Sequence, residues 1–319
     1  MNTRKICWKT TGKHAMSFVV LVGIVLHAVR QTEYHQMRVL LTTLQPRHLL
    51  PLVMLQIGTL LITTYLWAGP LSSRDHIRYR GIRHFAEVLR INSAASLMES
   101  LTPSSKLGGE GVKLVLLKKY TGMPVHHLTA LIVLHKTVVL VPLLVLGVGA
   151  MSLIPHGLPI DRLTLAAVLA GVSLVGITAA VSLIPAARHH LQLIFTSCAP
   201  YARWSLLLRL FGTATLMWLA YPLKYYIAAG IVQTPVPIHI AILATLASYM
   251  VSLLPVSPGG LGTFEITMAH VLQFHGTGFE AGLLIAVTGR LITFWLPLLV
   301  SALAAASFLR SPLQAPDYA

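Results

Sequence analysis

Long apolar runs separated by short polar or Pro/Gly-rich connections dominate the chain. Six runs are long enough to cross a bilayer, whose hydrocarbon core of roughly 30 Å takes about 20 mostly apolar residues per helix. No stretch shows the short apolar–polar alternation of barrel strands. The pattern therefore predicts an all-α polytopic membrane protein, a single domain over 1–319, with spanning helices at about 15–29, 49–71, 128–154, 163–185, 206–230 and 280–308.

Two further apolar segments, at about 92–119 and 236–276, are interrupted in the middle by Pro, Ser and Gly. Such breaks are typical of discontinuous or re-entrant helices, which membrane proteins tolerate where the backbone is buried in protein or lines a cavity. We therefore predict two broken helical hairpins beside the six full spans. The part 236–254 is long for half a hairpin, so a full crossing there is the alternative.

The two breaks also resemble each other. With residue 96 aligned on residue 248, seven positions are identical in both segments, namely Ser96, Met98, Ser100, Leu101, Pro103, Ser105 and Gly108. This match coincides with both helix breaks and favours an internal repeat, with halves at about 50–154 and 206–309. Three spans separate the hairpins, so the second would enter the membrane from the opposite face. Inverted repeats of this kind occur in secondary transporters.

The composition agrees with a membrane protein and adds a strong charge bias. Of the 319 residues, 55% are hydrophobic and 10% are charged, whereas soluble domains carry about 25% charged residues. The net charge is +15. We predict no nucleic-acid binding, because no soluble basic domain with groove-reading elements is present. The basic residues fall instead in loops, where they set topology and attract anionic lipid heads.

Five charged residues in or beside the apolar segments are candidate binding residues: Glu110, Lys113, Lys136, Glu265 and Arg290. A charge at the bilayer centre costs roughly 2.5–3.5 kcal/mol, so each needs a partner, a wet cavity or a proton. Each broken segment supplies an acid and the next span supplies a base, which predicts buried ion pairs. The pairs could simply lock helices together. Alternatively the bases also meet a lipid phosphate, with Arg290 best suited to bidentate contact.

The breaks themselves supply the remaining candidate residues for binding a lipid headgroup. Prolines there remove amide donors, and glycines allow another backbone or a ligand to approach closely. A helix beginning near Thr263 would point its positive N-terminal end at the second break, which favours an anionic group. These candidates are Pro103, Gly108, Gly109, Pro255, Ser257, Pro258, Gly259 and Gly260.

Other polar residues indicate no further chemistry. The 15 histidines show no metal-binding spacing such as HExxH, and no Ser/His/Asp set indicates an enzyme. We therefore predict no catalytic residue, no metal and no cofactor. Tyr221, Tyr225 and Tyr226 surround Lys224, and we interpret this group as membrane-interface anchors or packing.

The block Leu254–Glu265 resembles the signature of the lysylphosphatidylglycerol synthase transmembrane-region family, in which Pro-x-Ser-Pro-Gly-Gly-x-Gly-x-x-Glu precedes a helix containing Arg, here Arg290. The stretch from Asn92 to Lys113 is similar to an earlier block of the family. The family usually has Arg where this chain has Lys113 and Lys136, a change that keeps the charge and loses the bidentate fork. The resemblance covers about residues 50–309.

The resemblance implies a protein that moves or handles lipids in the bacterial inner membrane. Our leading hypothesis is a flippase for a phospholipid or other polar-headgroup lipid. The expected partners are membrane lipids, anionic lipids or glycolipids above all. The alternatives are an intramembrane transferase acting on lipids and a non-catalytic accessory subunit of a lipid-synthesis enzyme. We expect no attached soluble aminoacyltransferase domain, so lipid synthesis would need a separate enzyme.

The charge distribution gives a testable topology. With a cytoplasmic N-terminus and C-terminus, the outer loops hold only four Lys or Arg residues: Arg30, Arg38, Arg47 and Arg162. A cysteine at position 188, in a chain lacking Cys7 and Cys198, should then resist a membrane-impermeant thiol reagent added outside intact cells. Labelling of Arg188→Cys from outside would contradict this orientation.

Overall fold

The computed structural model describes residues 46–72, 81–101, 107–152, 196–197, 201, 203–253 and 257–310. All regular elements of this part are helical. The helices are α3 (Pro46–Ser72), α4 (Ile82–Leu101), α5 (Leu107–Thr121), α6 (Val125–Ser152), α9 (Trp204–Ile231), α10 (Ile238–Val251), the short η2 (Pro258–Gly260), α11 (Thr263–Phe274), α12 (Phe279–Arg290), the π-turn η3 (Leu291–Trp295) and α13 (Leu296–Arg310).

Four stretches of helix are long and apolar enough to cross a membrane: Arg47–Ser72, Val125–Gly147, Trp204–Ile231 and Phe279–Phe308. They confirm the spans predicted at about 49–71, 128–154, 206–230 and 280–308. The spans predicted at 15–29 and 163–185 lie outside the described residues. The chain is thus a multi-pass membrane protein, and a total of six spans remains a prediction.

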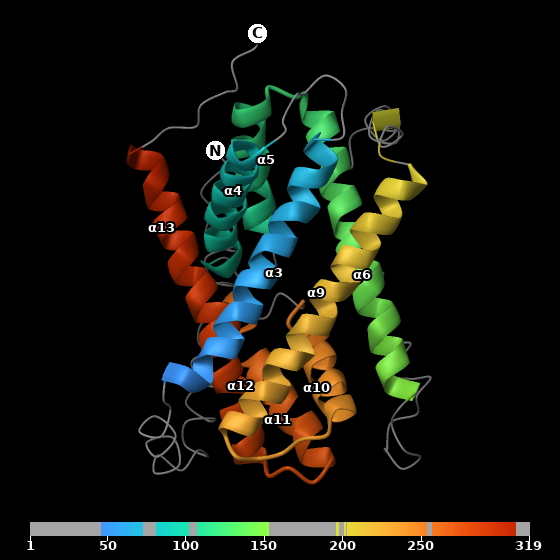
Figure 1. Ribbon diagram of the computed structural model, residues 1–319, viewed down its shortest axis with the longest axis vertical. Coiled ribbons are helices and arrows are strands. Elements are labelled where there is room, and N and C mark those ends of the chain that lie inside the picture. Colours follow the sequence, from blue (N-terminus) through green and yellow to red (C-terminus); the bar gives the residue numbers. More distant parts are fainter. Residues whose placement is uncertain are drawn as a thin grey trace, which may run out of the picture.

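Separate helices flank each predicted break, and residues 102–106 and 254–256 between them lie outside the described residues. The first separates α4 from α5 and the second separates α10 from α11, and in each case the two helices pack against each other as a hairpin. Figure 1 shows α4 and α5 toward one end of the long axis and α10 and α11 toward the other, with α3, α6 and α9 running between. Opposite ends are what an inverted repeat would require, although the repeat itself remains a prediction.

Glycine and proline set the helix boundaries around the first hairpin. Helix α5 ends where Gly122 adopts a left-handed φ of +66°, and its N–H closes the last turn on the carbonyl of Lys118 at 2.9 Å. This is the usual role of glycine just after a helix. Pro124 then precedes α6 and accepts the N–H of Leu128 at 3.3 Å. The chain therefore turns within three residues from the hairpin into the next span.

The last span is the most enclosed of the four. About half of its apolar window is buried (50%), compared with 28–33% for the others. The π-turn η3 divides it into α12, which packs on α9 and α11, and α13, which packs on α4. Small residues allow this packing, as is common between membrane helices. The span that carries Arg290 thus touches both hairpins.

Gly289 provides a test of this packing. A β-carbon there would overlap the ring of Tyr225 on α9. Gly289→Ala should therefore destabilise the protein by about 1–3 kcal/mol, the usual cost of overpacking, and lower its melting temperature in detergent. The matched control is Gly212→Ala, because position 212 has open space around it and alanine favours a helix. Equal melting temperatures for the two variants would contradict the α9–α12 contact.

Candidate functional site

The second break places a carboxylate at the start of α11. Gly262 precedes the helix with a φ of +80°, and Glu265 lies in the first turn. The Oε2 atom of Glu265 accepts the Gly262 N–H at 2.7 Å. A carboxylate is favoured there because it satisfies a free N–H group and faces the positive end of the helix. The break therefore fixes the position of Glu265.

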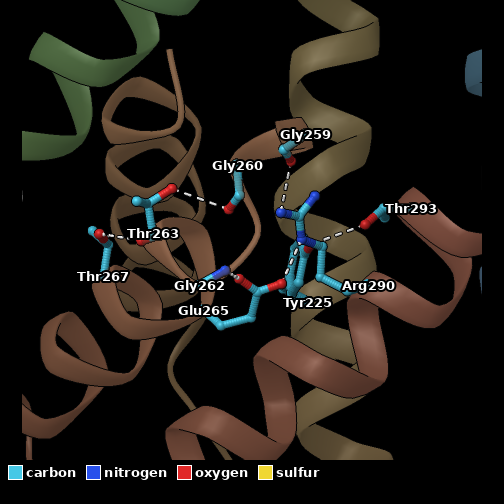
Figure 2. A network of polar contacts seen from close by, with 9 residues as sticks. All are labelled: Tyr225, Gly259, Gly260, Gly262, Thr263, Glu265, Thr267, Arg290 and Thr293. Carbon is cyan, nitrogen blue, oxygen red and sulfur yellow. Dashed lines mark hydrogen bonds and ion pairs between the residues drawn. The ribbon is translucent and has the colours of Figure 1, made fainter. Parts of the chain in front are cut away.

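Arg290, the last residue of α12, joins this carboxylate to the break (Figure 2). Its Nε donates to Oε1 of Glu265 at 2.8 Å, and its Nη2 donates to the carbonyl of Gly259 at 3.0 Å. The exposed fraction of the side chain is 8% for Arg290 and 11% for Glu265. In a medium of low dielectric constant, such a charge-assisted pair is much stronger than it would be in water.

Two aromatic rings enclose the guanidinium. The ring of Phe264 lies 4.6 Å from Cζ of Arg290 and the ring of Phe294 lies 4.7 Å away, both within cation–π range. Gly259 packs against Phe294 with a φ of +58°, and a β-carbon there would overlap that ring. Glycine is therefore required both by the backbone conformation and by the close contact. Phe264 and Phe294 were not predicted from the sequence.

The break also contains a buried hydroxyl group. Ser257, two residues before Gly259, is buried, and its Oγ has no hydrogen-bond partner among the described residues. Pro258 begins η2, and the carbonyl of Gly260 accepts the hydroxyl of Thr263 at 3.0 Å. An unsatisfied buried hydroxyl costs free energy, so it suits a position that bonds a ligand or water.

The first hairpin carries the corresponding pair. Glu110 lies in the first turn of α5, and its Oε1 is 2.6 Å from Nζ of Lys136 on α6 and 3.8 Å from Nζ of Lys113. The side chain of Lys136 is 43% exposed, whereas that of Lys113 is 6% exposed. Lys113 also lies over the ring of Trp67 at 4.4 Å, and Trp67 stacks on His135.

Both predicted acid–base pairs are thus confirmed as ion pairs, and the Glu110–Lys136 pair is only partly buried. The five predicted charged residues form two groups, one at each hairpin, and no ion pair seen within the described chain joins the groups. Within that same part, no three His, Cys, Asp or Glu side chains cluster as a metal site would require.

The remaining predicted site residues belong to the two breaks, and only some of them are described. Pro103 and Pro255 lie outside the described residues, and Gly108 lies in the first turn of α5. A β-carbon on Gly109 would come within 2.8 Å of Cβ of Glu99. Gly109 therefore allows α5 to approach α4 closely.

Lys224 agrees with the packing alternative of its sequence interpretation and not with the membrane-interface alternative. Lys224, interpreted as part of an anchoring or packing group, is fully buried on α9 and donates to Oε1 of Gln56 at 2.7 Å and to Oγ1 of Thr59 at 2.8 Å. Of the nearby tyrosines, Tyr225 is buried and Tyr226 is exposed. The signal for Lys224 was a lysine inside an apolar span, which should have been treated as functional or paired.

The comparisons with known proteins identify the family. The family model described as the lysylphosphatidylglycerol synthase TM region matches residues 15–301, so the chain belongs to this family. Neither a curated protein nor a solved structure matches the chain significantly.

The geometry predicts that Glu265 and Arg290 depend on each other for stability. Glu265→Gln or Arg290→Met alone leaves a buried charge without its partner and should destabilise by about 3–5 kcal/mol. The double variant should regain much of that loss in melting temperature. Glu87→Gln is the control, because the Glu87–Arg90 pair is partly exposed and exposed pairs contribute about 0–1 kcal/mol. A double variant that is less stable than either single variant would contradict the pair.

Proposed function

We propose that this member of the lysylphosphatidylglycerol synthase TM region family is a lipid translocator, which moves a lipid with a polar headgroup across the bacterial inner membrane. The N-terminus and C-terminus would both be cytoplasmic. One observation carries the proposal. Two broken hairpins lie toward opposite ends of the bundle, the second break contacts helix α4 of the first hairpin, and each hairpin holds an acid–base pair.

The contact between the hairpins lies at the second break. A β-carbon on Gly259 would be 3.4 Å from the carbonyl of Ser100, near the end of α4. Ser100 belongs to the helix that precedes the first break, so the backbone of the second break packs against the end of α4. Such backbone is tolerated within a membrane where it is buried or lines a cavity. A headgroup that leaves one hairpin would therefore meet the other.

The Arg290 site has the chemistry to hold a phosphate on this path. A guanidinium has five N–H donors, and two of those of Arg290 are bonded within the described chain, to Glu265 and Gly259. A phosphate could engage the remaining donors with bidentate geometry. Ser257 adds an unsatisfied hydroxyl in the same break. The acyl chains would stay in the bilayer while the headgroup crosses.

Two other functions agree with the family: an intramembrane transferase that acts on lipids, and an accessory subunit of a lipid-synthesis enzyme. A transferase needs a nucleophile or an acid/base pair next to its acceptor. The acid–base pairs found here are ion-paired instead. An accessory subunit would move no lipid when purified. Lipid movement by the isolated chain therefore separates the three functions.

The test is lipid scrambling by purified protein in proteoliposomes, read as dithionite bleaching of a fluorescent phospholipid. We expect wild-type protein to expose the inner-leaflet label, and Arg290→Lys to slow this exposure. Lysine keeps the charge but offers no fork for a phosphate. The double variant Glu265→Gln/Arg290→Met should fold but not translocate.

Glu87→Gln serves as the control variant, because the Glu87–Arg90 pair lies within α4, outside the break. It should translocate lipid at the wild-type rate. If the purified wild type moves no lipid, the translocator proposal is wrong. If the double variant matches the wild type, the ion pair is purely structural and the headgroup passes elsewhere.

A further inference from the structure

Lys224 differs from the other buried Lys and Arg residues in the groups that contact its side chain. Three Lys or Arg side chains are buried in the described chain: Lys113, Lys224 and Arg290. Lys113 and Arg290 each have a carboxylate oxygen within 4.0 Å. The partners that Lys224 contacts in this part of the chain are all uncharged: an amide oxygen, a hydroxyl and an aromatic ring. Among the described residues, Lys224 is therefore a buried lysine inside a span with no carboxylate partner.

An uncompensated charge in a span is costly, and intramembrane charges usually mark a ligand or ion path. We propose that Lys224, with Gln56 and Thr59, forms a second headgroup subsite that binds the phosphate of an anionic phospholipid. The inference rests on the proposed translocation and adds a substrate class to it. Carboxylates compensate the Lys113 and Arg290 sites, whereas a bound phosphate would supply the missing charge at Lys224.

The partners of Lys224 can change their hydrogen-bonding role. Gln56 and Thr59 now accept from the ammonium, but an amide and a hydroxyl can also donate. All three side chains could therefore donate to one phosphate. Both neutral partners lie on α3 and Lys224 lies on α9, so a displacement of α3 from α9 would break both bonds together and uncover the ammonium.

A continuous row of rings connects this subsite to Arg290. Lys224 lies 4.3 Å from the ring of Tyr221, and Tyr221 contacts Tyr249 with their centroids 4.8 Å apart. Tyr249 contacts Phe264 at 4.9 Å, and Phe264 faces the guanidinium of Arg290 at 4.6 Å. A cation thus lies at each end of one aromatic row.

The experiment compares Lys224→Gln with Arg209→Gln, which removes the same charge from an exposed position on the same helix. Each protein is placed in phosphatidylcholine nanodiscs with increasing phosphatidylglycerol, and the melting temperature is followed. Phosphatidylglycerol should stabilise the wild type. For Lys224→Gln, the fraction needed for half the effect should rise roughly tenfold, the loss expected for one charge-assisted contact. Arg209→Gln should behave as the wild type.

Several outcomes would overturn the inference. An equal response of Lys224→Gln and the wild type would overturn it, even if the wild type scrambles lipid normally and the translocator proposal stands. Equal stabilisation of the wild type by soluble glycerol phosphate would show a free-phosphate site and remove the lipid assignment. If Lys224→Gln does not fold, the wild type is instead cross-linked to phosphatidylglycerol that carries a photoreactive group on its headgroup, and the labelled residues are mapped. Cross-links to α3 near Gln56 and α9 near Lys224 support the subsite, and cross-links confined elsewhere overturn it.

Discussion

The ion pair between Glu265 and Arg290 connects the second hairpin to the last span. It connects three elements at one point, because Glu265 also caps α11 and Arg290 also binds the carbonyl of Gly259 in the break. In the core of a bilayer, neither the charges nor the broken backbone can form hydrogen bonds with water. The break in the helix and the charged pair are therefore a single structural solution, in which each satisfies groups that the other leaves open.

The corresponding charged group at the first hairpin is more exposed than the Glu265–Arg290 pair. Its acid, Glu110, has two lysines within 4.0 Å, and the side chain of one of them, Lys136, is partly exposed. A compact ammonium on a flexible stem lacks the planar fork with which a guanidinium binds a carboxylate and a backbone carbonyl together. The two halves thus combine a rigid cationic centre with a more open one. If the protein translocates lipid as proposed, this difference would make the two ends of the path unequal.

Much of this arrangement could be predicted because membranes simplify the physical problem. The length of the apolar runs predicted the four spans that are described, and the Pro and Gly residues of Pro255–Gly262 indicated the second break. The scarcity of charge made it reasonable to pair Glu265 with Arg290. The sequence could not predict which rings face Arg290, because Phe264 and Phe294 come from different helices. Nor did it show that Lys224 points inward, since a lysine near tyrosines also suits the membrane surface.

The π-turn at Leu291–Trp295 explains how one membrane span packs against both hairpins. A π-turn accommodates one residue more than the α-helical turn it replaces, and one residue corresponds to about 100° of rotation around the helix axis. The faces of α12 and α13 are therefore out of phase. This offset lets the segment before it present Arg290 to the second hairpin, while the segment after it turns a different stripe of side chains toward α4. The one extra residue of the π-turn thus rotates α13 relative to α12, so that the two segments of the span can pack against different hairpins.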